Sequence, residues 1–194
     1  FVKGKLANKR RLQALLGLEQ LDSAPLFFWP SRLAPVQKGC QLLTDILYET
    51  VNKYWNDRLQ IVVIANGPYQ KHFHDIVKFH NLYPRVAVRN FDEKLSHIAY
   101  AASDYLLMPS LFEPCGLPQM ISMLYGSLPL AHDTGGLHDT VLPLNLKAGT
   151  GSGFLFEIYD PNGLRWAIGE AMNFHHQPAG ALLLVKAGGQ TAGC

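Results

Sequence analysis

The feature that most constrains the fold is a regular alternation of short apolar runs with longer stretches that are apolar on one side only. The run from Leu59 to Ala65 is apolar almost throughout, which is typical of a strand buried on both faces of a sheet. Between such runs, apolar residues recur at helical spacing, as Leu43, Ile46 and Leu47 do. The strand–helix unit repeats about six times, which predicts an α/β fold: a doubly wound parallel sheet covered by helices on both faces.

The same pattern places the elements. Strands are expected at residues 25–29, 59–65, 85–90, 104–108, 128–131 and 154–156. Helices are expected at residues 5–16, 42–54, 70–82, 93–102 and 117–126, and a last one is expected to begin after Asp160-Pro161. The glycine-rich segments near 135–136 and 149–153 are interpreted as connections. We expect one domain over 1–176 and an irregular tail over 177–194, a frayed end or an expression remnant, because the tail lacks any turn or cap pattern.

Length and charge exclude several classes of protein. A chain of 194 residues that is 48% apolar can form a core of its own, so disordered, collagen-like and mini-protein classes are excluded. The net charge of +2 is too mild for a nucleic-acid binder, and the run Lys9-Arg10-Arg11 is expected to solvate a helix face. No apolar stretch approaches the ~20 residues that span a bilayer. We therefore expect a soluble protein with neither nucleic-acid nor membrane partners.

Three cysteines, Cys40, Cys115 and Cys194, are odd in number and far apart in the sequence. This usage favours a reducing compartment over a disulfide framework. The first residue is Phe rather than Met, so we expect the chain to be a segment of a longer protein.

Candidate functional residues follow the strands, because ligands of a parallel sheet bind at the carboxyl ends of its strands. Arg32 and Lys38 follow the first strand, and Glu113 follows the fourth. Two cations suit phosphate oxygens, a carboxylate accepts hydrogen bonds from sugar hydroxyls, and nearby glycines let backbone amides approach a ligand. The dinucleotide fingerprint and the P-loop are both absent from the sequence. The pattern indicates a site for a pyrophosphate linked to a polyol.

Simpler interpretations exist for each residue. Arg32 could be a surface ion-pair residue, and Glu113 could be an acid that favours a helix N-terminus. Cys115 is expected to be a small buried residue rather than a nucleophile, since no partner is spaced to activate it. Gly135-Gly136 alone would indicate only a turn.

The tryptophans and histidines give weaker signals. Trp29, Trp55 and Trp166 lie in strand or helix patterns and are expected in the core, although an exposed one could stack on sugar rings. The histidines lack metal-ligand spacing, so no metal site is expected.

Three motifs carry a resemblance to a known family. They are Ser31-Arg32-Leu33 through Gln37-Lys38-Gly39, Phe112-Glu113-Pro114-Cys115-Gly116-Leu117, and Thr134-Gly135-Gly136-Leu137. In order and in spacing they resemble the nucleotide-sugar half of bacterial glycogen synthases and plant starch synthases, from about residue 3 to about residue 176. The resemblance implies the C-terminal, Rossmann-like domain of a two-domain GT-B glycosyltransferase. Such enzymes transfer glucose from ADP-glucose to the non-reducing end of an α-1,4-glucan with retention, without a metal ion or other cofactor.

The resemblance also implies roles for residues of this chain. Arg32 and Lys38 would hold the diphosphate and offset the charge on the leaving ADP, and Glu113 would orient the donor glucose. The remaining substrate-binding residues would bind the ligand through backbone amides or would let the main chain lie close to the nucleotide. They are Ser31, Gly67, Cys115, Gly116, Leu117, Thr134, Gly135 and Gly136. Tyr100 or Tyr105 is a weaker candidate for contact with the base. The glucan acceptor would bind a separate N-terminal domain whose lysine-glycine-glycine motif is absent from these residues.

The sequence departs from the family pattern at three points. Arg32 and Lys38 are six positions apart where most members have five, Leu111 stands where arginine is common, and Ile121 stands where many related transferases carry a second glutamate. Two other functions stay open: a non-catalytic nucleotide-sugar or partner-contact module, and a transferase of the same fold that uses UDP-glucose. The resemblance implies a bacterial cytoplasm or a plastid, and an isolated domain without activity, since half of the cleft would be missing.

Overall fold

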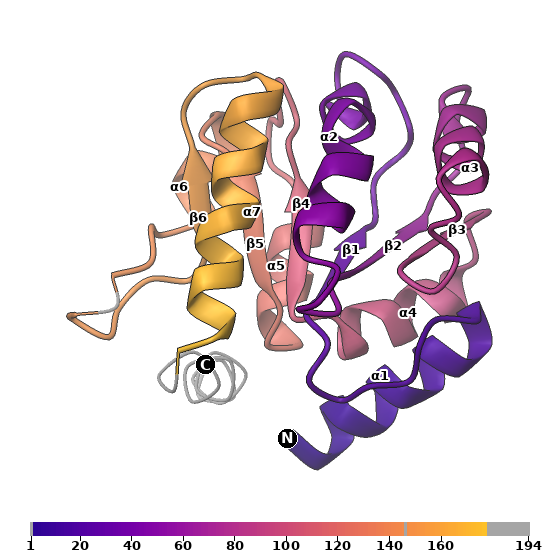
Figure 1. Ribbon diagram of the computed structural model, residues 1–194. Coiled ribbons are helices and arrows are strands. Elements are labelled where there is room, and N and C mark those ends of the chain that lie inside the picture. Colours follow the sequence, from indigo (N-terminus) through magenta and orange to yellow (C-terminus); the bar gives the residue numbers. More distant parts are fainter. Residues whose placement is uncertain (1, 146, 178–194) are drawn as a thin grey trace.

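A six-stranded, all-parallel sheet forms the centre of the protein, as shown by a computed structural model that describes residues 2–145 and 147–177 (Figure 1). Its strand order is β3-β2-β1-β4-β5-β6. The strands are β1 (Leu26–Trp29), β2 (Gln60–Ile64), β3 (Val86–Arg89), β4 (Tyr105–Met108), β5 (Leu128–His132) and β6 (Phe154–Phe156). The order reverses between β1 and β4, which is the topological switch point of a doubly wound sheet.

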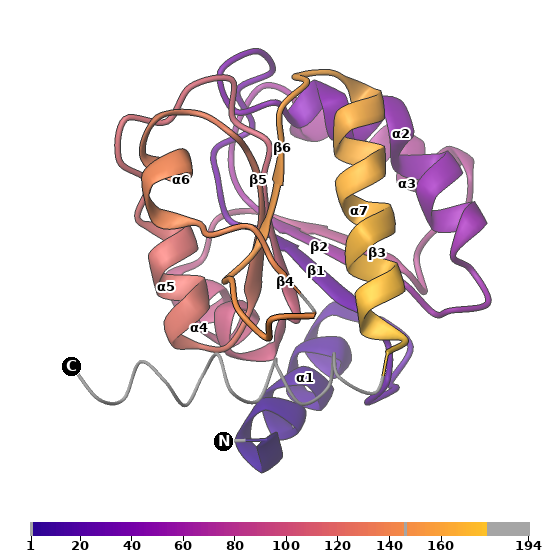
Figure 2. The same ribbon diagram turned by 90° about the vertical axis from the view of Figure 1, so that its left-hand side faces the viewer.

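Seven helices among the described residues connect the strands and cover both faces of the sheet. They are α1 (Val2–Leu16), α2 (Cys40–Lys53), α3 (Gln70–Phe79), α4 (Glu93–Ala102), α5 (Pro118–Leu124), α6 (Gly135–Thr140) and α7 (Pro161–His175). Helices α2, α3 and α7 pack on one face, and α1, α4, α5 and α6 lie on the other (Figure 2). The predicted doubly wound α/β fold is therefore confirmed.

Strand β1 shows why a continuous apolar run is needed at the centre of this sheet. Successive side chains of a strand point to opposite faces. Phe27 and Trp29 accordingly lie in the core beneath α2 and α7, whereas Leu26 and Phe28 lie in the core on the α1 and α4 side. All four are buried, so a polar residue at any of them would lose its hydration.

A buried ion pair lies at the amino-terminal edge of the sheet, where the parallel strands begin. Lys9 of α1 donates from Nζ to Oδ2 of Asp104 over 2.6 Å and to the carbonyl oxygen of Ala24 over 2.9 Å. The prediction that Lys9 solvates a helix face is thus wrong, since only 3% of its side chain is exposed. Arg10 and Arg11 are exposed as predicted. Lys9 is buried because Asp104, at the start of β4, offers it a charge partner inside the protein.

Other differences from the predicted elements are local. The segment after Thr134, interpreted as a glycine-rich connection, forms the short helix α6. Trp166 lies on the solvent side of α7 and is 55% exposed, so its predicted core position is wrong. Apart from Gln177, the expected tail lies outside the described residues. Within the described part of the chain, no helix is long and apolar enough to span a membrane.

Candidate functional site at the switch point of the sheet

The candidate residues gather where the strand order reverses. The loop over 30–39 follows β1, the loop over 109–117 follows β4, and Asp133 and Thr134 follow β5. Because β1, β4 and β5 are neighbours, their carboxyl ends bring these three segments to one edge of the sheet. This is the edge at which the sequence predicted a ligand site.

An ion pair between two of these loops forms the centre of the site. Lys38 Nζ donates to Glu113 Oε2 over 2.5 Å, and the two side chains are 14% and 12% exposed. The hydroxyl of Ser110 lies 3.4 Å from the same carboxylate oxygen. The longer loop between Arg32 and Lys38 therefore still delivers the lysine to the glutamate.

Glycines allow the loops to pack this closely. Gly39 has a φ of +70°, and a Cβ there would lie 1.9 Å from the carbonyl oxygen of Pro109. A Cβ on Gly136 would lie 2.2 Å from the carbonyl oxygen of Cys115, and one on Gly135 would lie 2.3 Å from that of Glu113. No side chain fits at such distances, so these three positions require glycine.

Backbone hydrogen bonds join the loops to one another. The amide of Leu111 donates to the carbonyl oxygen of Gln37 over 3.0 Å, which ties the loop after β4 to the loop after β1. The amide of Gly136 donates to the carbonyl oxygen of Glu113 over 2.8 Å, which ties the start of α6 to the loop after β4. The main chain around Glu113 is thus fixed from two sides.

The remaining residues of the first motif lie near the ion pair or support its loop. Arg32 is exposed on the loop and stands outside the Lys38–Glu113 pair. The carbonyl oxygen of Ser31 accepts a hydrogen bond from Trp29 Nε1 over 2.6 Å. Gly67, after β2, packs against this loop, since a Cβ on it would lie 2.7 Å from the carbonyl oxygen of Leu33.

The residues after Glu113 line the open side of the loop. Cys115 and Leu117 are exposed, so the prediction that Cys115 is buried is wrong. Gly116 has a φ of +73°, and a Cβ there would lie 2.5 Å from Oε1 of Gln119. Thr134 takes the N-cap position of α6 without a capping side-chain hydrogen bond.

The two tyrosines proposed for the nucleotide base lie elsewhere. Tyr105 is buried in the sheet, where its hydroxyl donates to the carbonyl oxygen of Ala171 over 3.0 Å. Tyr100 is largely buried and packs edge-on against Phe28, with ring centroids 5.1 Å apart. Burial raises the pKa of Tyr100 to about 12. Neither ring faces the three loops, so this part of the prediction is wrong.

Three residues of the site were not singled out from the sequence. Ser110 lies beside the Glu113 carboxylate, and His132 Nδ1 lies 2.9 Å from the carbonyl oxygen of Ser110. A carbonyl oxygen only accepts, so Nδ1 carries the proton of this bond. The hydroxyl of Tyr159 donates to the carbonyl oxygen of Val36 over 2.5 Å. Ser110 and His132 could have been found from their place at the ends of β4 and β5, whereas no sequence signal joins Tyr159 to Val36.

A second polar pair lies at the start of α6. His138 Nδ1 contacts Asp133 Oδ1 over 2.6 Å, and the imidazole is well exposed. The hydrogen bond to Asp133 and the charge of that carboxylate raise the pKa of His138 above its usual value of 6.5.

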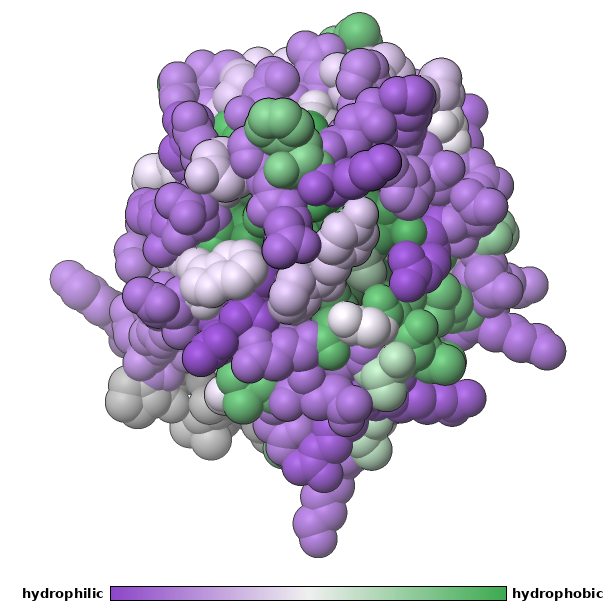
Figure 3. All heavy atoms as spheres, turned by 45° about the vertical axis from the view of Figure 1, so that its right-hand side comes forward, coloured by the Kyte–Doolittle hydropathy of each residue, from purple (hydrophilic) through white to green (hydrophobic). Residues whose placement is uncertain are grey.

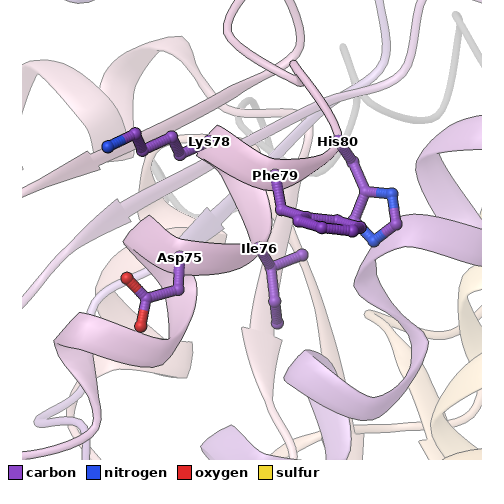
Figure 4. A pocket seen from close by; sticks show the side chains of 5 residues that line it. All are labelled: Asp75, Ile76, Lys78, Phe79 and His80. Carbon is purple, nitrogen blue, oxygen red and sulfur yellow. The ribbon is translucent and has the colours of Figure 1, made fainter.

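Among the described residues, no metal-ligand cluster marks this site, and two of the hollows on the surface lie elsewhere. Among residues 2–145 and 147–177, no group of three His, Cys, Asp or Glu side chains is placed to hold a metal ion. The hollow formed by Asp75, Ile76, Lys78, Phe79 and His80 has a volume of about 580 Å³ and lies at the end of α3, away from the three loops (Figure 4). Another hollow, of about 590 Å³, is lined in part by Leu15 and Phe91. On the face of the molecule that Figure 3 shows, hydrophobic residues form patches within a largely hydrophilic surface.

The geometry determines the chemistry that the edge can perform. An ammonium has three protons and a carboxylate about four acceptor positions, so the Lys38–Glu113 contact leaves both groups with capacity for a ligand. With the exposed Arg32, the Lys38–Glu113 pair offers two cations for an anion and the Glu113 carboxylate for hydroxyl groups. The strand order and this cluster together define the class: a doubly wound α/β domain with a cluster of polar side chains at its switch point.

Comparisons with known proteins give the family. The family model described as "Glycosyl transferases group 1" matches residues 24–173. The chain therefore belongs to the group 1 glycosyl transferases. Over 178 residues it is 42% identical to the glycogen synthase of Streptococcus gordonii, covering 90% of this chain and 36% of that protein. Over 176 residues it is 38% identical to the glycogen synthase of Bacillus subtilis, covering 89% of this chain and 35% of that protein.

A solved structure supports the same relationship. The catalytic domain of starch synthase IV from Arabidopsis thaliana, bound to ADP and acarbose, matches with a TM-score of 0.84 and 35% identity. The match covers 96% of this chain and 39% of that chain. The resemblance to glycogen and starch synthases and the GT-B fold class are thereby confirmed. The chain spans little more than a third of the length of these relatives.

Proposed function

We propose that this chain is the donor-binding half of a glucan synthase that uses ADP-glucose to extend an α-1,4-glucan with retention of configuration. The observation that carries the proposal is the Lys38–Glu113 ion pair at the switch point, held by the three motifs that resemble those of glycogen and starch synthases. The similarity to glycogen synthases and to starch synthase IV supports it.

Lys38 and Arg32 bind the diphosphate in this proposal. The first turn of α2 follows Lys38 directly, carries no acidic residue and has no side-chain cap, so its amides favour an anion next to the lysine. When the bond between the anomeric carbon and the diphosphate breaks, negative charge builds up on the leaving ADP. Two cations that are already in place stabilise that charge without a metal ion.

Glu113 orients the glucose. Its carboxylate accepts hydrogen bonds from sugar hydroxyls while Lys38 keeps it in position, and the backbone of Gly135 and Gly136 lies against the same loop. The oxygen of the glucan's terminal 4-hydroxyl bonds to the anomeric carbon, the bond to ADP breaks, and the hydroxyl proton leaves with the diphosphate. The exposed segment Cys115-Gly116-Leu117 and Thr134 complete the sugar and phosphate contacts.

The acceptor glucan is expected to bind a part of the longer relatives that this chain does not span. Transfer needs donor and acceptor held at attack distance in a cleft with little water. The isolated 194-residue chain is therefore expected to bind the donor without elongating a glucan. The described cysteines, Cys40 and Cys115, are free thiols, which supports a reducing compartment such as a bacterial cytoplasm or a plastid.

Calorimetry of the chain with ADP, ADP-glucose and UDP-glucose tests the proposal. Binding of ADP and preference for ADP-glucose are expected, and the absence of heat at millimolar ADP would refute the proposal. Preference for UDP-glucose would favour the transferase with a different donor. The extra residue between Arg32 and Lys38, Leu111 and the missing acceptor domain motivate the second candidate, a non-catalytic nucleotide-sugar module. Fusion to the N-terminal domain of a glycogen synthase separates the two, because glucose transfer by the fusion excludes the non-catalytic module.

A further inference from the structure

A buried glutamine joins the loop that carries Glu113 to helix α6. Gln119 is the second residue of α5 and is fully buried. Its Nε2 donates to the carbonyl oxygen of Cys115 over 3.0 Å and to the hydroxyl of Thr140 over 3.0 Å. Thr140, the last residue of α6, donates in turn to the carbonyl oxygen of Gly136 over 2.5 Å. Gln119 therefore ties the loop after β4 to α6, which lies beside α5 (Figure 2).

The side-chain amide of Gln119 is only partly satisfied. Its Oε1 is buried and has no hydrogen-bond partner among the described residues. A carbonyl oxygen only accepts, so the nitrogen of the amide must face Cys115 and the oxygen is left unpaired. A buried acceptor without a partner destabilises the fold. An apolar side chain of similar length, such as methionine, would avoid this loss, so the two donated bonds are what glutamine adds at this position.

The bond to Cys115 fixes the direction of a neighbouring backbone amide. The carbonyl of Cys115 and the N–H of Gly116 belong to one planar trans peptide and point in opposite directions. Because the carbonyl points toward Gln119, the N–H points away from the α5–α6 contact. Within residues 2–145 and 147–177, this N–H donates to no protein group, although Gly116 is buried. Buried backbone amides are almost always paired, which indicates that a ligand pairs with this one.

The opposite direction of this peptide is open to the chain. Turns of types I and II differ in the direction of one peptide plane, and a glycine in the left-handed region permits a direction that other residues disfavour. Gly116, with its φ of +73°, is such a glycine. In the rotated peptide the carbonyl oxygen of Cys115 would take the place of the Gly116 N–H, and an acceptor would replace a donor. The bond from Gln119 selects one direction over the other.

We infer that Gln119 is a positioning residue for the donor sugar, which holds the Cys115–Gly116 peptide with its N–H directed toward the donor. The inference rests on the proposed function, in which Glu113 of the same loop orients the glucose. Gln119 does not touch the donor and acts through the peptide that it holds. Since Lys38, which holds the diphosphate in the proposed function, belongs to a different loop, loss of the glutamine should affect the glucose more than the diphosphate.

Calorimetry of the 194-residue chain with ADP-glucose and with ADP tests the inference. Gln119→Met keeps the length of the side chain and removes both donors. We expect it to weaken ADP-glucose binding about tenfold and to change ADP binding less than about twofold. The urea midpoint should change little, because the unpaired Oε1 is lost together with the two donated bonds. Unchanged ADP-glucose binding, or equal weakening of both ligands, would overturn the inference.

Gln13 of α1 provides the matched control, since it is a fully buried glutamine as well. Its Nε2 donates to the carbonyl oxygen of Leu21 over 2.9 Å and to Oε1 of Gln60 over 3.0 Å, and its Oε1 accepts from the amide of Leu21 over 3.1 Å. Both polar atoms are paired, so Gln13→Met should lower the urea midpoint more than Gln119→Met does. It should leave both ligands bound as before. An equal loss of ADP-glucose binding in Gln13→Met would assign the effect to general destabilisation and contradict the positioning role.

The backbone amide signal of Gly116 in NMR reports the peptide direction without a ligand. In Gln119→Met this signal should shift and broaden as two peptide directions exchange, whereas Gln13→Met should leave it in place. A Gly116 signal that is the same in Gln119→Met and in the unsubstituted chain would refute the positioning role, even where binding falls.

The outcomes separate this inference from the proposed function. A chain that binds neither ADP nor ADP-glucose refutes the proposed function and the donor role of Gln119 with it, and the Gly116 signal then shows whether Gln119 orients the peptide. A chain that binds both ligands, with Gln119→Met binding them equally well, overturns the inference and leaves the proposed function intact.

Discussion

The two edges of the sheet each carry a lysine paired with a carboxylate, and the two pairs differ in what surrounds them. At the amino-terminal edge, Lys9 and Asp104 are 3% and 6% exposed, and Asp104 also accepts a hydrogen bond from the amide of Leu26 over 2.9 Å. At the carboxyl edge, Lys38 and Glu113 are 14% and 12% exposed, and among the described residues the hydroxyl of Ser110 is the one further hydrogen-bond partner of their side chains. The first pair is more fully enclosed by protein than the second.

The surroundings of Asp104 show what closure does to a carboxylate. Burial alone raises its pKa, but Lys9, Lys5 and His175 together with the hydrogen bond from Lys9 outweigh burial, so the pKa lies below its usual value. Asp104 therefore stays charged across the neutral range and contributes stability that is lost only as the pH falls through this lowered pKa. The more deeply buried pair therefore stabilises the fold, whereas under the proposed function the Lys38–Glu113 pair holds its charges for the donor.

The largest expected effect comes from breaking the Lys9–Asp104 pair. Lys9→Ala leaves the Asp104 carboxylate buried without its main partner, which costs about 3–5 kcal/mol of unfolding free energy. Urea denaturation followed by circular dichroism measures the loss. A destabilisation below about 1 kcal/mol would show that Lys5 alone compensates the charge of the Asp104 carboxylate. It would contradict the idea that the Lys9–Asp104 pair stabilises the fold more than the Lys38–Glu113 pair does.

A substitution at Gly39 tests how tightly the loops of the carboxyl edge are packed. Gly39 and Gly17 have nearly equal φ angles, +70° and +72°, but a Cβ on Gly17 meets nothing within 4 Å. Gly17→Ala should therefore show only the strain of a left-handed backbone, about 1–2 kcal/mol. Gly39→Ala should lose about 1–3 kcal/mol more, because its Cβ overlaps the backbone of Pro109. Thermal unfolding of the two variants side by side gives the difference, and equal losses would contradict the packing argument.

Breaking the Lys38–Glu113 pair should affect binding more than folding. Lys38→Ala is expected to weaken ADP binding by about 1.5–3 kcal/mol, the contribution of a charged hydrogen bond, and to leave adenosine binding unchanged. Arg32→Ala should show the same selectivity for the diphosphate. Lys38→Ala should lower the unfolding free energy by less than Lys9→Ala does, since the Lys38 and Glu113 side chains are less deeply buried than those of Lys9 and Asp104. Calorimetry and urea denaturation measure the two quantities, and equal losses for ADP and adenosine would argue against phosphate contact.

The smallest effect is expected at the exposed pair of His138 and Asp133. Asp133→Asn should lower the pKa of His138 toward 6.5, which NMR titration of the imidazole protons measures. The folded-state pKa is raised, so the pair contributes stability below about pH 6.5 and loses that contribution as the pH rises through the higher folded pKa. An unchanged pKa in Asp133→Asn would show that the hydrogen bond does not control this histidine.

Strand positions and motif loops could be predicted because both depend on local sequence. Lys9 could not be placed, since its burial depends on Asp104, which lies 95 positions away in the chain. Trp166 could have been placed: Leu164, Ala167 and Ile168 define the buried side of α7, and Trp166 falls outside that stripe. Helix α6 was missed because glycine disfavours helices, and the carbonyl oxygens that require Gly135 and Gly136 belong to another loop.

The backbone hydrogen bonds between the loops have an evolutionary consequence. Leu111 is held to Gln37 through main-chain atoms, and Leu33 is held to the carbonyl oxygen of Asn66 in the same way, over 3.0 Å in each case. Such bonds do not depend on side-chain identity, so mutations at exposed loop positions such as Val36 and Leu111 leave them in place. Side chains in these loops can therefore change one at a time during evolution while Lys38 and Glu113 stay in contact. Substitutions at neighbouring exposed positions are expected to have little effect on the structure of the loops.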